Sequence, residues 1–329
     1  MRPASVPSPA TLGLTRPTAA EDLARLGWDN ADSLELLWTL AAAGDPDLAL
    51  NTLMRVFEGA PEIGPALRED ETFRVRLIAL LGGSSAFGDH LAANPGTWQE
   101  LQRALPTPTE MLHTLLTTIG AEPATFAEQP DRPDTASEDL TTPGTYRAEA
   151  GEHKAQLKTV YRTLMMRIAA HDLAGTFHSR KGQSRPQPRV GFREVTRLTT
   201  ALADAALTAA LASAVRVVYG DDSLDAQLSV IAMGKCGAGE LNYISDVDVL
   251  FVGSEATPRV TRLASEFNRI GSACFFEVDA NLRPEGKSGA LVRTLDSHIA
   301  YYKRWAETWE FQAQLKARPQ TGYMPLGKD

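Results

Sequence analysis

The sequence predicts an α+β fold in which a helical bundle precedes a small mixed sheet with flanking helices. Two observations carry this prediction. Apolar residues recur at helical spacing through most of residues 18–121, with few signs of strands. After residue 227 the pattern changes to short apolar runs separated by glycine-rich or polar turns, which is typical of strands. With 329 residues, 43% of them hydrophobic, the chain is long enough for about two globular domains.

The N-terminal end is predicted to be a disordered tail, residues 1–17. This stretch is rich in proline and lacks the apolar centre of a secretory signal peptide. A helical region is predicted for residues 18–121, and it begins with Thr18 and Glu21, whose spacing is that of a capping box. Leucines at helical spacing continue through the region, while prolines and a glycine pair divide it into several helices.

The middle of the chain is predicted to hold an acidic linker or loop, residues 122–152, because large aliphatic side chains are nearly absent there. The second domain is predicted for residues 153–329. Within it, residues 179–192 are basic and polar, which favours a solvated loop over a contact with an acidic partner. A long alanine-rich helix is predicted for residues 193–218 and should pack on the sheet.

Strands and helices alternate in the last part of the chain. The strands are predicted at residues 228–233, 247–252, 276–280 and 290–294. The helices are predicted at residues 258–275, 296–302 and 305–316. Trp305 and Trp309 are expected in the core, because large aromatic side chains dominate core burial. Glu310 is interpreted either as a polar partner of the functional site or as a surface charge.

Net charge and cysteine content limit the possible functions. A net charge of −8 makes the chain a poor general binder of DNA or RNA, but it leaves room for one local nucleotide site. Two cysteines, Cys236 and Cys274, are too few for a disulfide framework and indicate a reducing cytoplasm. Cys236 is interpreted as a small residue in a tight turn, with a redox role as the less favoured alternative. The sequence has no uninterrupted apolar run of about 18 residues, so we expect no membrane span and no membrane among the partners.

The most informative motif is at residues 231–253, which read IAMGKCGAGELNYISDVDVLFVG. Asp246 and Asp248 stand at the start of an apolar run. Because side chains at i and i+2 of a strand point the same way, the two aspartates should present their carboxylates to one spot. Adjacent carboxylates repel each other unless a cation lies between them, and magnesium prefers oxygen ligands. The motif therefore predicts a magnesium site.

Glycines precede this pair of aspartates. Gly234, Gly237 and Gly239 would let the backbone approach phosphate groups closely, with free N–H groups pointing outward. A helical turn at residues 240–243 would favour an anion at its N-terminal end. The spacing is not that of a Walker A loop, and no βαβ pattern surrounds it as in a dinucleotide-binding fold. The glycines therefore predict a phosphate site beside the carboxylates.

The order of strand, glycine-rich turn and D-x-D strand resembles the nucleotidyltransferase superfamily typified by DNA polymerase beta. The block MGKCGAGELNYISDVDVLF is similar to the signature of the bifunctional glutamine synthetase adenylyltransferase/adenylyl-removing enzymes. Four further blocks resemble the same family, in its N-terminal half and actinobacterial type. They are LIALLGGSSAFGDHLAANPGTW, LMMRIAAHDLAG, FEVDANLRPEGKSGALVR and YYKRWAETWEFQAQLKARP. The resemblance covers residues 20–320 approximately.

The resemblance implies a polymerase-beta-like nucleotidyltransferase domain and a third catalytic carboxylate at Asp279, in a D-x-x-L-R-P strand. Asp246, Asp248 and Asp279 would then bind two Mg²⁺ ions that stabilise in-line displacement at phosphorus. Asp279 would share a metal or orient the nucleophile. The residues expected to bind nucleotide or phosphate are Gly234, Lys235, Gly237, Ser245 and Arg283. Lys235 could instead be solvated, and Arg283 could instead pair with Glu285 or Asp279.

In this family the N-terminal catalytic domain removes AMP from a tyrosine of glutamine synthetase by phosphorolysis, and the C-terminal one attaches AMP from ATP. The resemblance therefore implies deadenylylation, with glutamine synthetase, adenine nucleotide and orthophosphate as partners. In the full-length family a nitrogen-signalling regulatory protein is a further partner. The alternatives are ATP-dependent AMP attachment and a non-catalytic docking fragment, with a small-molecule adenylyltransferase a distant third. The chain is expected to be truncated relative to the family.

Overall fold

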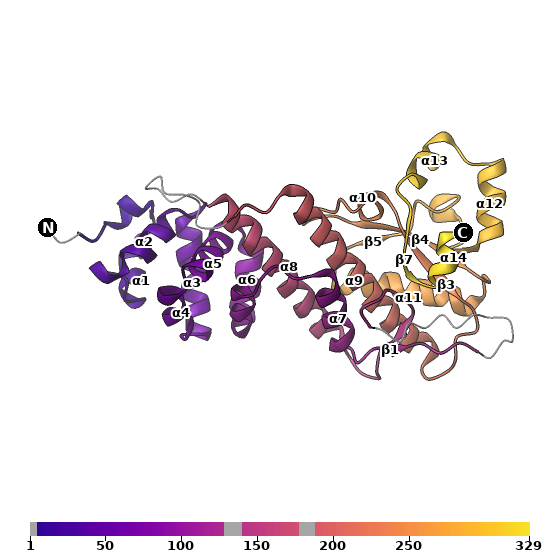
Figure 1. The fold of residues 1–329 in the computed structure, drawn as a ribbon, viewed down its shortest axis with the longest axis horizontal. Coiled ribbons are helices and arrows are strands. Elements are labelled where there is room, and N and C mark those ends of the chain that lie inside the picture. Colours follow the sequence, from indigo (N-terminus) through magenta and orange to yellow (C-terminus); the bar gives the residue numbers. More distant parts are fainter. Residues whose placement is uncertain (1–4, 128–139, 178–187) are drawn as a thin grey trace. The chain divides into compact units, whose positions relative to one another are not determined.

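The computed structural model describes residues 5–127, 140–177 and 188–329 and confirms the α+β fold (Figure 1). Helices dominate the N-terminal part of the chain, and a small mixed sheet with flanking helices follows, as the sequence predicts.

The chain divides into two compact units. The first consists of Met1–Pro106 and Arg162–Val195, and the second of Thr107–Tyr161 and Thr196–Asp329. The predicted domain boundaries do not coincide with this division, because each unit combines segments that are far apart in the sequence. Two of the three unit boundaries fall within long helices, α8 (Lys154–Thr176) and α9 (Phe192–Tyr219), and the third lies between Pro106 and Thr107.

The first unit contains short helices. They are η1 (Pro9–Leu12), α1 (Ala19–Arg25), η2 (Ala31–Ser33), α2 (Leu34–Ala41), α3 (Pro46–Gly59), α4 (Ile63–Glu69), α5 (Glu71–Gly83), α6 (Ser85–Ala93) and η3 (Pro95–Gln102). Helix α5 contacts α2, α3, α4 and α6 and is buried on nearly all sides. Aspartate side chains accept backbone N–H groups at two helix starts, Asp45 at α3 and Asp70 at α5, so these ends are satisfied locally.

The predicted disordered tail is wrong for its described part, residues 5–17. Leu12 at the end of η1 is fully buried, and Leu14 is nearly so. Thr15 donates its backbone N–H and its hydroxyl to Asp47. Two leucines in a proline-rich stretch are enough to bind it to the helices, because burying each one stabilises the folded state by about 1.5–3 kcal/mol. Residues 1–4 lie outside the described residues.

The second unit contains a mixed sheet in the order β5-β4-β3-β7, with β6 also pairing with β4. Its strands are β3 (Leu228–Ala232), β4 (Val247–Gly253), β5 (Val278–Asp279), β6 (Val292–Thr294) and β7 (Arg318–Gly322). β3 is antiparallel to β4 and β7, whereas β4 is parallel to β5 and β6. Four of these strands were predicted. β7 was not, because it carries a proline and no alternating pattern, which suits its place at a sheet edge.

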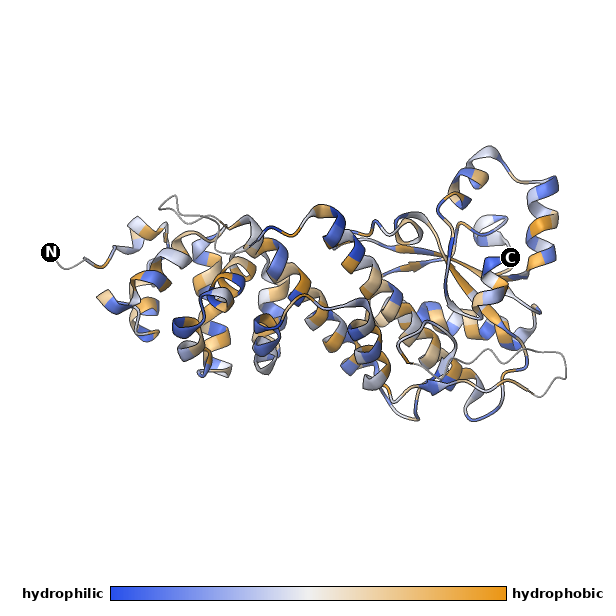
Figure 2. Cartoon of the chain, in the orientation of Figure 1, coloured by the Kyte–Doolittle hydropathy of each residue, from blue (hydrophilic) through white to orange (hydrophobic). Residues whose placement is uncertain are grey.

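The two faces of β4 differ in what covers them. On one face Val249 and Phe251 are buried, and the Phe251 ring meets Phe267 of α11 (Pro258–Cys274) with centroids 5.5 Å apart. On the other face Leu250 and Val252 pack towards the C-terminal helices. These are α12 (Leu295–Arg304), α13 (Thr308–Gln314) and α14 (Met324–Lys328). Figure 2 shows hydrophobic colouring on the central strands.

Helix α9 matches the predicted alanine-rich helix and packs on the sheet. The amide of Gln320 in β7 donates to the main-chain oxygen of Asp204 in α9 at 2.7 Å. By length and composition α9 could cross a membrane, and 67% of its most apolar stretch is buried within the fold. Core helices have the same composition when they are apolar all round.

The predicted burial of Trp305 and Trp309 is wrong. Their relative exposures are 66% and 56%. Helix α13 is a single short element whose buried side is used by Glu310, which is 5% exposed. The Glu310 carboxylate accepts the backbone N–H of Glu307 and the hydroxyl of Tyr301, so it caps the helix and is neither a surface charge nor a group directed at the carboxylates.

The predicted acidic linker has regular structure at both of its ends. Its ends form β1 (Glu122–Pro123) and β2 (Tyr146–Arg147), which pair antiparallel near helix α7 (Pro108–Thr118). Tyr146 is fully buried and supplies the apolar anchor that the stretch otherwise lacks. Residues 128–139 lie outside the described residues, as does most of the basic segment 179–192.

Candidate active site

Two of the three predicted carboxylates lie in neighbouring parallel strands, and the third immediately precedes one of these strands. Asp248 in β4 pairs in register with Asp279 in β5. Asp246 precedes Asp248 by two residues, so strand geometry directs both to one face. Val247 between them is fully buried, as that alternation requires. The structure thus brings together the three aspartates that the sequence singled out.

These carboxylates influence one another electrostatically. Partial burial raises the pKa of Asp248, and the nearby charges of Asp246 and Asp279 raise it further. The ammonium group of Lys235 lowers it. The cluster therefore has excess negative charge, and a bound cation would relieve it.

The fit of a metal ion to this cluster is partial. Among the residues that the structure describes, no three His, Cys, Asp or Glu side chains converge on one metal position. One carboxylate oxygen of Asp279 accepts the backbone N–H of Asn281 at 2.7 Å. The arrangement suits an ion held by one or two carboxylates, with water and phosphate oxygens as its other ligands. Magnesium binds proteins in this way.

The glycine-rich segment forms a helix, α10 (Gly234–Ala238). The sequence predicted a turn here and a helical turn at residues 240–243, but residues 240–243 are not helical. Gly239, with φ +74°, ends the helix in the left-handed conformation that glycine allows. A Cβ atom at Gly234 would lie 2.8 Å from a carboxylate oxygen of Asp248. The backbone of Gly234 therefore lies directly beside the carboxylates, as a phosphate-binding segment should.

Gly237 has a different role from the predicted one. Its N–H donates to the carbonyl of Met233 and is not free for a phosphate. A Cβ atom at this position would overlap the carbonyl oxygen of Lys316. Glycine is needed at position 237 because two backbone segments meet there.

Lys235 and Ser245 flank the carboxylates in the sequence. Lys235 is exposed, and its ammonium group donates to Asn242 at 3.2 Å while acting on Asp248. Ser245 is half-buried immediately before Asp246. The positive charge of Lys235 thus acts at the carboxylates, and its predicted phosphate contact stays a prediction. The predicted phosphate contact of Ser245 stays a prediction.

Arg283 has a structural role. Its guanidinium donates to the carbonyls of Ala280, Lys287 and Gly289, which holds the loop after β5 in shape. Glu285, which was considered as its partner, pairs with Arg293 instead. Three of the five N–H donors of Arg283 are occupied within its own loop, which argues against the predicted phosphate contact.

A family model for glutamate-ammonia ligase adenylyltransferase matches residues 75–328 of the chain. The chain belongs to the glutamate-ammonia ligase adenylyltransferase family. The match includes α10 and all three aspartates, so the family assignment and the carboxylate cluster fall on the same residues.

Curated relatives in this family are named bifunctional glutamine synthetase adenylyltransferase/adenylyl-removing enzyme. The Corynebacterium efficiens protein is 57% identical over 98% of the chain, which corresponds to 32% of its own length. The Corynebacterium diphtheriae protein is 53% identical over 98% of the chain and 34% of its own length. The Mycobacterium tuberculosis protein is 44% identical over 98% of the chain and 30% of its own length. The chain thus spans about a third of these family members.

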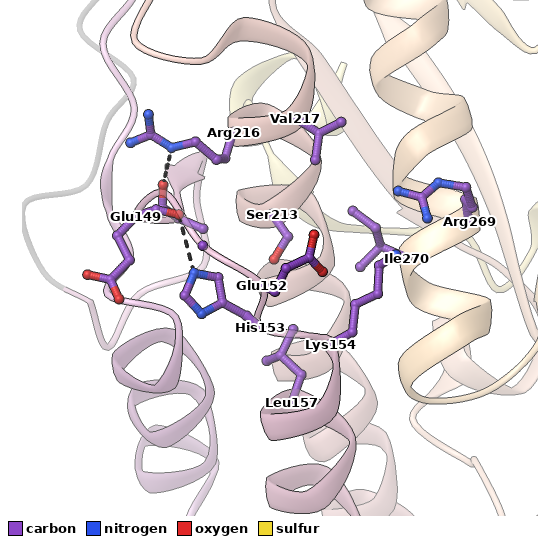
Figure 3. Close-up of a pocket in the computed structure, with 12 residues that line it drawn as sticks. Glu149, Glu152, His153, Lys154, Leu157, Ser213, Arg216, Val217, Arg269 and Ile270 are labelled. Atoms are coloured by element: carbon purple, nitrogen blue, oxygen red, sulfur yellow. Dashed lines mark hydrogen bonds between the residues drawn. The ribbon is translucent and has the colours of Figure 1, made fainter.

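Two cavities have linings that include none of the three aspartates. One, of about 570 Å³, lies on the sheet face of Leu250 and Val252, beneath the aromatic rings of Tyr302 and Phe311. The other, of about 100 Å³, is shown in Figure 3. There Arg216 donates to the carbonyl of Ala148, and opposite charges surround the opening. None of the residues predicted to bind substrate lines either cavity.

Sequence reasoning missed two charged residues next to α10. Asp204 of α9 and Arg318 of β7 form an ion pair at 2.9 Å. A signal was present for Asp204, because it is the only charged residue in the apolar stretch ALADAALTAALA. Arg318 lies in the last block that resembles the family, but its partner cannot be read from the sequence.

Proposed function

We propose that the chain is the adenylyl-removing part of a glutamine synthetase adenylyltransferase. The supporting observation is the cluster of Asp246, Asp248 and Asp279 beside the backbone of Gly234 and the ammonium of Lys235. Carboxylates next to a close-approaching glycine and a cation suit transfer at phosphorus. The relatives' names supply the substrate, glutamine synthetase, and the two directions of the reaction.

In the proposed reaction, an oxygen of orthophosphate attacks the phosphorus of the adenylyl group on tyrosine. The new P–O bond gives ADP, and the bond to the tyrosine oxygen breaks, so that the tyrosine leaves and takes up a proton. Mg²⁺ would neutralise the phosphate oxygens and stabilise the attacking and leaving oxygens. Asp246 and Asp248 would hold the cation, and Asp279 would bind it or orient the phosphate. Lys235 would add positive charge at the phosphates.

Adenylyl attachment from ATP would use the same carboxylates, so it is measured in the same assay. The blocks that resemble the N-terminal half of the family favour removal over attachment. A docking fragment without activity has no use for three clustered carboxylates, where partial burial and the charges of the other two aspartates raise the pKa of Asp248. We also propose a cytoplasmic location, because Cys236 and Cys274 are both free and buried.

The test uses adenylylated glutamine synthetase, Mg²⁺ and orthophosphate, with ADP as the product measured. We expect ADP formation by the chain, loss of at least about 100-fold in the Asp246→Asn/Asp248→Asn variant, and abolition by chelation. Asp296→Asn changes an exposed carboxylate on α12 and serves as the matched control, with unchanged activity.

Three outcomes are separable. Phosphate-dependent ADP formation that depends on Asp246 and Asp248 supports the proposal. AMP attachment from ATP without ADP formation overturns the direction. A folded chain that performs neither reaction, and that binds no nucleotide in a Mg²⁺-dependent way, leaves the docking fragment as the better explanation.

A further inference from the structure

We propose that Arg318 and Asp204 form a positioning pair that holds helix α10 beside the catalytic carboxylates. The inference rests on the proposed function for its kinetic consequences, but its structural part can be tested without any reaction. Neither residue is among those predicted to touch substrate. Their role would be to fix the backbone of Gly234 and Lys235 next to Asp248.

Helix α10 is too short to be stable by itself. It has only five residues, and an isolated helix of that length is unstable in water because nucleation costs more than a single turn returns. The N–H groups of Gly239 and Glu240 close its last turn. The carbonyls at its C-terminal end are also reached by one side chain from outside the helix.

Arg318 supplies that contact. Its Nη2 donates to the carbonyl of Cys236 at 3.1 Å, and its Nε donates to the carbonyl of Gly237 at 3.3 Å. The same Nη2 donates to Oδ1 of Asp204 at 2.9 Å. A positive charge at the C-terminal end of a helix also interacts favourably with the helix dipole. The guanidinium thus caps α10 and joins it to α9.

Asp204 completes the arrangement. Its carboxylate accepts from Arg318 and, weakly, from the Cys236 thiol with S···O 3.9 Å. Burial raises the pKa of Asp204 above its ordinary value, and the hydrogen bond and positive charge of Arg318 oppose this rise. The main-chain oxygen of Asp204 accepts from Gln320, which ties β7 to α9 on the same side.

Backbone packing makes the position of α10 strict. A Cβ atom at Gly237 would overlap the carbonyl oxygen of Lys316 and lie 2.6 Å from that of Ala232. The segment that leads into β7 therefore touches the end of α10 directly. At the other end of α10, Gly234 touches Asp248. A shift of α10 away from Arg318 would be transmitted over these five residues to the carboxylates.

The structural test is hydrogen exchange of the chain alone. The amides of Gly237, Gly239 and Glu240 donate within and just after α10 and report its closure. In Arg318→Met we expect their exchange to be at least about tenfold faster, with little change in the exchange of α11. Arg318→Lys keeps the charge opposite Asp204 but cannot reach both carbonyls, so it should give an intermediate effect.

The matched control is Arg269→Met. Arg269 pairs with Glu266 within its own helix, α11, and such a partly exposed pair contributes little. Its variant should leave exchange at α10 unchanged. Unaltered exchange at α10 in both Arg318 variants would overturn the proposal. So would acceleration spread evenly over the whole second unit, which is what a general loss of stability produces.

The kinetic test uses the phosphorolysis assay. We expect Arg318→Lys to raise the KM for orthophosphate by about tenfold while kcat changes less than about threefold, because the phosphate-binding backbone is displaced and the carboxylates remain. An unchanged KM in an active variant would contradict the proposed role. If the wild-type chain has no activity, the proposed function fails, while hydrogen exchange still decides the positioning role.

Discussion

At the scale of single residues, burial raises the pKa values of two aspartates that differ in their charged neighbours. The pKa of Asp248 is raised by burial and by its acidic neighbours, whereas Asp204 has Arg318 to oppose the same effect of burial. The two aspartates therefore differ in what they need from outside the fold. Asp204 is satisfied within the chain. Asp248 has two acidic neighbours and one basic neighbour, so a cation from solution would stabilise its charged form.

His171 gives a prediction at this scale. Burial, together with the charges of Arg76 and Arg167, lowers its pKa to about 4, although a contact with the Arg103 carbonyl at 3.0 Å opposes this. A histidine whose pKa is lowered by folding is neutral in the fold and charged in the unfolded chain at mild acidity. It therefore removes stability as the pH falls from about 6.5 to about 4.

We expect His171→Gln to lose less thermal stability than the wild type over that pH range, and to show no such advantage above about pH 7. Thermal unfolding at a series of pH values measures the difference. An identical pH dependence in the two proteins would show that His171 is not the titrating group.

At the scale of elements, contacts with residues distant in the sequence determine the position of a short helix. Helix α10 is held by β7 and α9, and α13 is capped internally by Glu310. The segment WAETWEF, which runs from the end of α12 into α13, has the aromatic content of a core helix, yet its tryptophans lie on the surface. Short helices bury one side only, and in α13 that side is occupied by the capping glutamate.

The exposure of Trp305 and Trp309 predicts small effects on stability. Trp309→Ala and Trp305→Ala should each change the free energy of unfolding of the chain by less than about 0.5 kcal/mol. Trp28→Ala removes a side chain that is 2% exposed and should cost about 3–5 kcal/mol. Urea unfolding provides the comparison. A large loss in either tryptophan variant would mean that the substituted side chain is buried in solution.

At the scale of the whole molecule, charge limits the partners. The net charge of −8 opposes binding to nucleic acids. Their affinity for a protein depends on basic side chains that neutralise the phosphates and release counterions. We expect no binding of duplex DNA or of RNA tighter than about 100 µM at about 0.15 M salt. Fluorescence anisotropy with a labelled duplex tests this expectation. Micromolar affinity that weakens steeply with salt would refute it and would indicate a basic surface.

The family assignment and the candidate site followed from local patterns. Alternation along residues 247–252 placed Asp248 on one face and Val249 on the other, and the structure agrees. The D-x-x-L-R-P block located Asp279, which the sheet places in register with Asp248. Strand ends were less accurate, since the strand predicted at 276–280 is reduced to Val278–Asp279. The predicted metal and phosphate roles remain to be measured.

The sequence by itself determined what short-range periodicity and motif spacing encode: the α+β class, four strands of the sheet and the aspartates of the candidate site. Only the tertiary structure decided which residues support that site. Asp204 and Arg318 are 114 positions apart, and the requirement for Gly237 arises from the backbone at Lys316. No local pattern records such contacts, because they depend on how the chain brings distant backbone segments together. For the same reason the sequence predicted burial for Trp305 and Trp309, whereas packing left them exposed.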